Sequence, residues 1–437
     1  MLRNRIINLF IFCLCFIVSS NAQTAQMTLE QAVELCLKNN YDIIISKNSL
    51  TQVENNNTPG NAGMLPRVDL NASGSFATNA TKQEFSSGLV VDKPGVQSKN
   101  ISTGAYLTWT VFDGFKMFAT REKLQDLQSM GELNVKIQIE NTIVKVISAY
   151  YTIVIQKQLI NGFKENIAVS EERLKIAQTK FEVGASPKGD VLQAKIDLNA
   201  LKSGLMRQKT LLFSAKTDLN QLMIRPVDTD FDVSDSIPLM KKYLFEELKN
   251  SILTNNSEML FAQKNIEVSK AAVNEGKAIN YPKLNLNSNY IFSRSQNQAG
   301  FSLLNQNLGL NLGFTASWNV FNGFNNANII KNLQLDLENS NYEYESLKTL
   351  TQAGLVKAFQ KYQDDNAILQ LEEENKLLVK ENLDVALERF RLGASTSLEL
   401  KVAQQSFEDS INRLADARFN LKISETQLLK LSGGIMK

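Results

Sequence analysis

The feature that most constrains this chain is an internal repeat. The segment Trp-Thr-Val-Phe-Asp-Gly-Phe at residues 109–115 recurs as Trp-Asn-Val-Phe-Asn-Gly-Phe at residues 318–324, which is 209 positions later. Phe-Glu-Val-Gly-Ala-Ser at 181–186 recurs at the same offset as Phe-Arg-Leu-Gly-Ala-Ser at 390–395. Because two separate segments share one spacing, the chain is predicted to contain two copies of a single structural unit.

Upstream of these segments the offset is larger. Leu-Pro-Arg at 65–67 matches Tyr-Pro-Lys at 281–283, which lies 216 positions further on. The difference of seven residues predicts a longer loop in the first copy, between Pro66 and Trp109. The predicted division of the chain is a leader at 1–22, a first repeat at 23–225 and a second repeat at 226–437.

The leader has the pattern of a secretory signal peptide. Arg3 and Arg5 precede an apolar run at 6–18, and small residues follow at Ser20 and Ala22, so cleavage is predicted before Gln23. The alternative is a membrane anchor, but 13 residues are fewer than the ~20 that span a bilayer. No later run reaches 18 apolar residues, so we expect an exported chain without a transmembrane helix.

Composition excludes several classes of function. The chain has no histidine, which excludes a Ser-His-Asp triad, a Cys-His dyad and an imidazole zinc site. Lys plus Arg number 47 against 45 Asp plus Glu, so nucleic acid is not an expected partner. Cys36 is the single cysteine after the leader, which excludes a disulfide framework. We therefore expect no catalytic residue, cofactor or metal site.

Each repeat contains a pair of candidate β-strands. Residues 308–320 alternate apolar and polar side chains almost without error, and 284–292 is the partner, while the first copy has 68–72 and 101–109. One interpretation is a soluble sheet with one buried face. The other is a membrane barrel with Trp109 and Trp318 in an interfacial aromatic girdle. Because four strands are fewer than the ~8 of the smallest membrane barrels, a barrel requires oligomerisation.

Long helices account for most of the remainder. Opening helices are expected at 28–57 and 241–278. After the second strand of each repeat we expect a helix of about 65 residues, which is roughly 100 Å long. It should end at a glycine, Gly184 in the first repeat and Gly393 in the second, where the chain reverses direction. Return helices follow at 188–223 and 396–431. Helices of this length need coiled-coil partners. The two hairpin tips are either plain turns or docking surfaces.

At this point the sequence resembles the TolC-type outer-membrane efflux proteins. The resemblance rests on the repeated unit, the Val-Phe-Asp-Gly motif before the long helix, and the Phe-x-x-Gly tip that occurs twice behind a signal peptide. It implies an α+β membrane protein in the outer membrane of a Gram-negative-type bacterium. Three chains would form a 12-stranded β-barrel and a periplasmic α-barrel, with four transmembrane strands and two helical hairpins from each chain.

The resemblance also implies partners and sites. The chain would be a passive channel of a tripartite efflux or type I secretion system, as a homotrimer in contact with outer-membrane lipid, a periplasmic adaptor and an inner-membrane RND or ABC pump. The implied adaptor-docking residues are Phe181, Val183, Gly184, Ala185, Phe390, Leu392, Gly393 and Ala394. Glu399 and its counterpart Asp190 are candidate entrance carboxylates, although Val402 stands where some relatives carry a second acid. The alternative function is a structural or adhesive coiled-coil surface protein.

Overall fold

The computed structural model describes residues 26–238, 243–299 and 302–436, so the predicted signal peptide lies outside the described residues. The chain divides into two compact units. The helical unit comprises the described parts of residues 1–44, 138–255 and 352–437, and the sheet unit comprises 45–137 and 256–351. Each unit takes segments from both sequence repeats.

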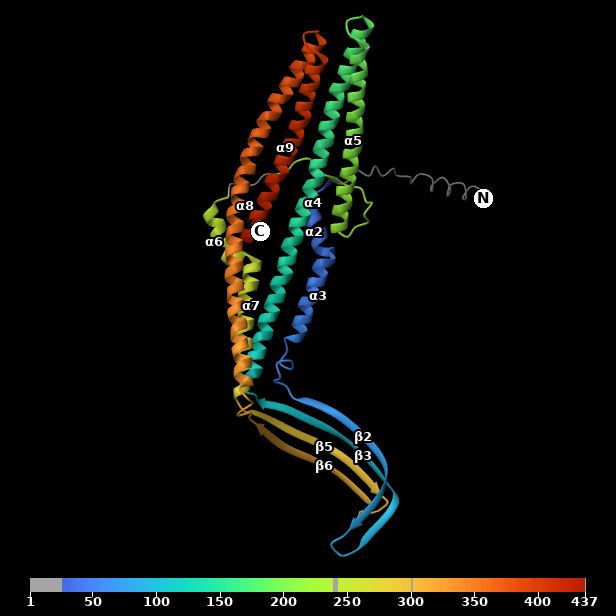
Figure 1. The fold of residues 1–437 in the computed structure, drawn as a ribbon, viewed down its shortest axis with the longest axis vertical. Helices are drawn as coiled ribbons and strands as arrows, with labels where there is room; N and C mark the ends of the chain where they lie inside the picture. Colours follow the sequence, from blue (N-terminus) through green and yellow to red (C-terminus); the bar gives the residue numbers. More distant parts are fainter. Residues whose placement is uncertain (1–25, 239–242, 300–301, 437) are drawn as a thin grey trace, which may run out of the picture. The chain divides into compact units, whose positions relative to one another are not determined.

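The sheet unit contains one four-stranded antiparallel sheet. Its strand order is β2-β3-β5-β6, so the two repeats meet where β3 pairs with β5 (Figure 1). The strands are β2 (Arg67–Glu84), β3 (Val90–Phe112), β5 (Lys283–Asn297) and β6 (Leu304–Ser317). The edge strands β2 and β6 each have one neighbour in the described chain.

The sheet has one polar and one apolar face. On the polar face uncharged side chains bond across the strands: the Asn311 amide donates to Asn289 at 2.8 Å, and Thr110 donates to Asn285 at 3.0 Å. On the other face, Leu310, Leu312 and Phe314 are exposed by 69–77% of their surface. The described residues therefore do not cover the apolar face, which contradicts the interpretation of a sheet buried within its own chain.

Two details of the strands differ from the sequence prediction. The seven extra residues of the first copy do not form a longer loop, because β2 and β3 have 18 and 23 residues against 15 and 14 in β5 and β6. Strand β6 also ends at Ser317 and not at Val320. Ser317 is the last residue of β6 that pairs with β5, and its partner is Lys283. The residue before Lys283 is Pro282, which has no N–H to continue the hydrogen bonding between the strands.

The two opening helices are each broken once, which the sequence prediction missed. Asn40 and Asn256, which are 216 positions apart, lie at the breaks. Asn40 Oδ1 accepts from the backbone N–H of Asp42 at 3.0 Å, and Asn256 Oδ1 accepts from that of Met259 at 2.9 Å. Asparagine favours such N-capping over a helix interior. The helices are α2 (Leu29–Asn39), α3 (Tyr41–Asn56), α6 (Phe245–Asn255) and α7 (Ser257–Lys277).

The long hairpins confirm the predicted helix lengths. Helices α4 (Lys116–Glu182) and α8 (Asn325–Arg391) have 67 residues each, and α5 (Lys188–Leu222) and α9 (Ser397–Ser432) return from them (Figure 1). In the described chain, α4 is the one helix apolar enough to cross a membrane, judged by length and composition only. It also carries fully buried residues such as Val146, and a core helix has the same composition.

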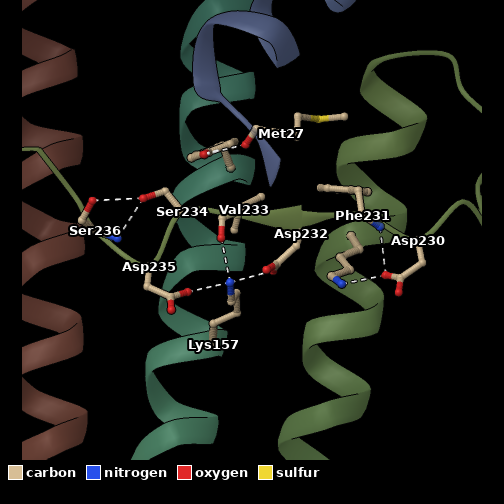
Figure 2. A network of polar contacts seen from close by, with 11 residues as sticks. Met27, Lys157, Asp230, Phe231, Asp232, Val233, Ser234, Asp235 and Ser236 are labelled. Carbon is tan, nitrogen blue, oxygen red and sulfur yellow. Dashed lines mark hydrogen bonds and ion pairs between the residues drawn. The ribbon is translucent and has the colours of Figure 1, made fainter. Parts of the chain in front are cut away.

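A short segment at the start of the second repeat is fixed to α4. Strands β1 (Gln26–Met27) and β4 (Asp232–Val233) pair in parallel, and Lys157 Nζ donates to Asp232 and Asp235 at 2.6 Å and to the carbonyl of Val233 at 2.7 Å (Figure 2). Burial alone would lower the pKa of Lys157, but the two carboxylates outweigh it and raise that pKa. The ion pairs are therefore present at neutral pH, and on the alkaline side they persist until the pH exceeds the raised pKa of Lys157.

Candidate functional site: the hairpin tips

The chain reverses at the two predicted glycines in the same way. Gly184 and Gly393 have φ angles of +75° and +77°, in the left-handed region where other residues are strained. The N–H of Ala185 donates to the carbonyl of Lys180 at 2.7 Å, and that of Ala394 donates to Arg389 at 2.8 Å. Both tips are therefore well-defined helix C-caps and not flexible loops.

The tips differ in which apolar side chains they expose. Phe181, Val183 and Leu392 are exposed, but Phe390 is only 5% exposed and packs with Leu400 and other buried residues of α8 and α9. The Lys180 ammonium donates to the carbonyl of Phe390 and lies 4.3 Å from its ring centroid. Phe390 therefore holds the two tips together and is buried in this chain, while the docking role predicted for the tip residues stays a prediction.

The two candidate carboxylates lie in the first turns of the return helices. The backbone N–H of Glu399 donates to the Thr396 hydroxyl at 3.2 Å, and that hydroxyl lies 3.4 Å from the Glu399 carboxylate. Asp190 occupies the first turn of α5. Negative charge is favourable at a helix N-terminus, so the helix dipole accounts for an acidic residue at both positions. A role at a channel entrance stays a prediction.

A buried ionic network that the sequence analysis missed lies beneath the tips. Arg173 of α4 is 1% exposed. Its guanidinium donates to Asp197 of α5 at 3.0 Å and to the Ser397 hydroxyl of α9 at 2.9 Å. Lys401 of α9 also donates to Asp197, at 2.9 Å. Burial raises the pKa of Asp197, but the bonds from Lys401 and Gln193 and the charge of Arg173 outweigh it, so this pKa is lowered.

A polar cavity of about 360 Å³ adjoins this network. Four buried polar atoms that line it have no hydrogen-bond partner among the described residues. They are Asn166 Oδ1, Ser170 Oγ, Arg173 Nε and Gln404 Nε2. A cavity of this size and polarity holds water. The contact between the two hairpins is therefore polar here, in contrast to the apolar cluster around Phe390.

The predicted interface aromatics lie in the sheet unit. Trp109 Nε1 donates to the carbonyl of Met64 at 2.9 Å, and Trp318 Nε1 donates to that of Asn280 at 3.1 Å. The acceptors are 216 positions apart, so both repeats make the same bond. Each ring is exposed while its polar atom is satisfied, which suits a membrane interface. The aromatic girdle itself stays a prediction.

Comparison with known proteins gives consistent matches over almost the whole chain. The family model described as outer membrane efflux protein matches residues 32–223 and 248–434, one match in each repeat. The chain is 22% identical over 432 residues to the probable efflux pump outer membrane protein TtgC and to the antibiotic efflux pump outer membrane protein ArpC, both of Pseudomonas putida. Each match covers 93% of this chain and 83% of the relative.

Solved structures show the same fold. The outer-membrane channel OprN superposes with a TM-score of 0.78 at 18% identity, covering 93% of this chain and 90% of OprN. The CmeC outer membrane channel of Campylobacter jejuni also gives 0.78, at 17% identity, covering 93% of this chain and 86% of CmeC.

The buried network generates a stability prediction. Asp197→Ala should lower the free energy of unfolding by about 3–5 kcal/mol, because it leaves Arg173 buried and unpaired. Glu171→Ala is the control, because it breaks the half-exposed Lys202–Glu171 pair and should cost about 1 kcal/mol or less. Thermal unfolding in detergent would measure both.

In the unmutated protein the contribution of Asp197 should be lost as the pH falls below about 4. Equal stability of the two variants would contradict this account of Arg173.

Proposed function

Since the chain belongs to the outer membrane efflux protein family and so is an outer-membrane channel protein, we propose that three copies close into one passive conduit. The conduit would dock on a periplasmic adaptor and receive its cargo from an inner-membrane pump. The chain itself would do no catalysis. The alternative of an adhesive coiled-coil surface protein finds no support, because the family model of the efflux proteins matches both repeats.

The open sheet is the observation that carries the proposal. Strands β2 and β6 leave one edge each without a strand partner in the described part of the chain, and the apolar face is exposed. A membrane contains no water to satisfy free backbone groups, so a spanning sheet must close on itself. Four strands are too few to close, since the smallest membrane barrels have about eight. Other copies of the chain must supply the remaining strands.

The repeat predicts how copies would join. Inside the chain, the second strand of one repeat pairs with the first strand of the next, so that Thr103 of β3 lies opposite Phe292 of β5. The equivalent of Thr103 in the second repeat is Leu312, 209 positions later, and the equivalent of Phe292 in the first repeat is Phe76, 216 positions earlier. The same pairing between two copies would therefore place Leu312 of β6 opposite Phe76 of β2 in a neighbouring copy. The side chains of Leu312 and Phe76 are both exposed, as this contact requires. Three copies would then give a continuous 12-stranded barrel.

The helical unit supports the same assembly. Exposed apolar residues follow heptad spacing on α8 at Leu371, Leu378 and Val385. A second exposed stripe on α5 includes Leu192 and Met206. Such stripes are the seams by which long helices pack together, and in the described chain nothing covers them. Neighbouring copies would cover both stripes in a tunnel of helices.

Disulfide trapping tests the predicted register. Phe76→Cys combined with Leu312→Cys should give disulfide-linked chains under oxidising conditions, because directly opposed residues have Cβ atoms ~4.5–5.5 Å apart. Non-reducing electrophoresis would show the linked chains as bands at multiples of the mass of one chain. Ala77→Cys with Leu312→Cys is the matched control, since residue 77 points to the opposite face. The native Cys36 is buried and should not interfere. Equal linkage in both pairs, or linkage in neither, would contradict the register.

The tips are the proposed adaptor-docking surface. Phe181, Val183 and Leu392 expose apolar surface on two rigid turns, which the buried Phe390 and Lys180 hold together. The turns themselves carry only glycine and alanine, so another helical hairpin could approach their backbone closely. These residues are Gly184, Ala185, Gly393 and Ala394. The names of the relatives TtgC and ArpC, as efflux pump outer membrane proteins, support a pump as the partner. That this pump is of the RND or ABC class is proposed from the resemblance alone.

Photo-crosslinking in living cells tests docking. A photoreactive amino acid at Leu392 should trap a periplasmic adaptor, to be identified by mass spectrometry. The same amino acid at Leu371, in the heptad stripe of α8, should trap only copies of this chain. If both positions trap only copies of this chain, the tips have no docking role, whereas loss of the Leu371 product would contradict the assembly itself.

A further inference from the structure

Two cations lie on the apolar face of the sheet, at the end where the chain turns from β2 to β3 and from β5 to β6. Lys99 of β3 lies directly opposite Gln296 of β5, and Arg294 of β5 lies directly opposite Ile101 of β3. Directly opposed residues share a face, so both charges point to the side of the apolar residues such as Ile101. Both side chains are exposed.

The two cations are close enough to bind one group. Lys99 and Arg294 are diagonal neighbours across β3 and β5, because each lies two residues from the other's partner. Such neighbours are ~7–8 Å apart at Cα, within the reach of long side chains. Gln306 of β6 lies opposite Arg294, so the amides of Gln296 and Gln306 flank the pair. Together these four residues form what we call the outer cation cluster, which is rich in N–H donors.

The neighbouring strands do not neutralise this charge. Strands β5 and β6 contain no acidic residue. The single acidic residue of β3, Asp92, lies opposite Lys82 of β2, beyond the irregularity in the pairing that follows Asn79. Among the described residues Lys99 makes no ion pair, and its ammonium lies 5.9 Å from the ring centroid of Phe76. Cationic donors without a carboxylate partner suit an oxyanion such as phosphate.

The outer cation cluster lies about one membrane thickness from the predicted interface tryptophan of β3. Lys99 and Trp109 are ten positions apart. Ten residues of strand extend about 33 Å, and the usual tilt of barrel strands reduces this to about 25 Å, the height of the apolar band of such barrels. A cation that faces lipid is costly at the bilayer midplane and nearly free at the interface. The cluster therefore marks the second boundary of the membrane.

The position of the long helices indicates which boundary this is. Helices α4 and α8 begin at Lys116 and Asn325, just after the opposite ends of β3 and β6. The protein lies in the outer membrane and extends into the periplasm, so with the helices in the periplasm the cluster faces the outer leaflet. In a Gram-negative-type bacterium this leaflet is built from lipopolysaccharide, whose lipid A carries phosphate groups at the membrane surface.

The repeat shows that the sheet does not need these charges for its geometry. The residues equivalent to Lys99 and Arg294 are Leu308, 209 positions later, and Thr78, 216 positions earlier. The predicted junction between β6 and β2 of neighbouring copies is thus uncharged at this level. The cluster belongs to the junction of β3 with β5, which is complete within one chain. Each copy would therefore carry one site.

We propose that the outer cation cluster binds a phosphate group of lipid A, one lipid for each chain. The Arg294 guanidinium can hold two phosphate oxygens at once, and the Lys99 ammonium adds a point charge. The acyl chains would lie along the exposed apolar side chains of Ile101 and Leu308. This inference rests on the proposed function, in which the sheet crosses the membrane, and it adds the lipid that the outer end of the sheet recognises.

Native mass spectrometry with added lipid tests the cluster and counts the chains in the same spectrum. The protein in neutral detergent would be titrated with diphosphoryl lipid A or with phosphatidylglycerol. The unmutated protein should bind up to one lipid A for each chain, more tightly than phosphatidylglycerol. Lys99→Gln combined with Arg294→Gln should weaken the binding of lipid A about tenfold or more, because it removes the charged donors.

A matched control removes one lysine and one arginine from the other end of the sheet. Arg67→Gln combined with Lys283→Gln takes away the same charge, at the first residues of β2 and β5, and should leave the binding of lipid A unchanged. A loss that is equal in both double variants would show that lipid A responds to net charge alone, which would overturn the cluster.

The remaining outcomes separate this inference from the proposed function. If the assembly has three chains and the cluster variant binds lipid A as the unmutated protein does, the cluster is wrong and the proposed function stands. If phosphatidylglycerol binds as tightly as lipid A, lipid A is not the ligand. If the particle has a single chain and only the cluster variant loses lipid A, the cluster is supported and closure by copies is contradicted.

Discussion

The two open edges of the β2-β3-β5-β6 sheet are the constraint on which the rest of this protein depends. Unpaired strand edges are costly in water because they aggregate, and they are costlier in lipid because nothing satisfies their backbone groups. The chain cannot remove either edge alone, and its apolar face at Leu310 and Phe314 stays exposed. Closing the sheet with further copies addresses both problems, and the exposed apolar stripes of α5 and α8 are consistent with that solution.

Duplication makes such closure simple. Because β3 and β5 already join the two repeats inside the chain, an intermolecular junction can repeat an intramolecular one. The Trp109 and Trp318 bonds, the caps that Asp113 and Asn322 form at the start of the long helices, and the tips at Gly184 and Gly393 all recur with the expected offsets. The repeats differ mainly where β2 and β3 are longer than their counterparts.

Much of the fold could be predicted from the sequence, because strand alternation and proline-free helices leave clear periodic signals. The breaks at Asn40 and Asn256 were missed, since apolar periodicity continues across a capping residue. The seven extra residues of the first repeat were predicted to form a longer loop, but they lengthen β2 and β3. The difference between the offsets 209 and 216 shows where residues are inserted, and it does not show what structure they adopt. At the tips, the motif did not distinguish exposed Phe181 from buried Phe390, because the neighbouring hairpin decides their burial.

The ionic network of Arg173, Asp197 and Lys401 was not predictable for a related reason: acidic and basic residues are mixed throughout these helices, and only the fold shows which are buried. The most direct test of the central claim, closure by copies of the chain, is the mass of the native assembly. Native mass spectrometry of protein released from the outer membrane in mild detergent should give three chains. A particle that contains a single chain, with its sheet intact, would contradict the account.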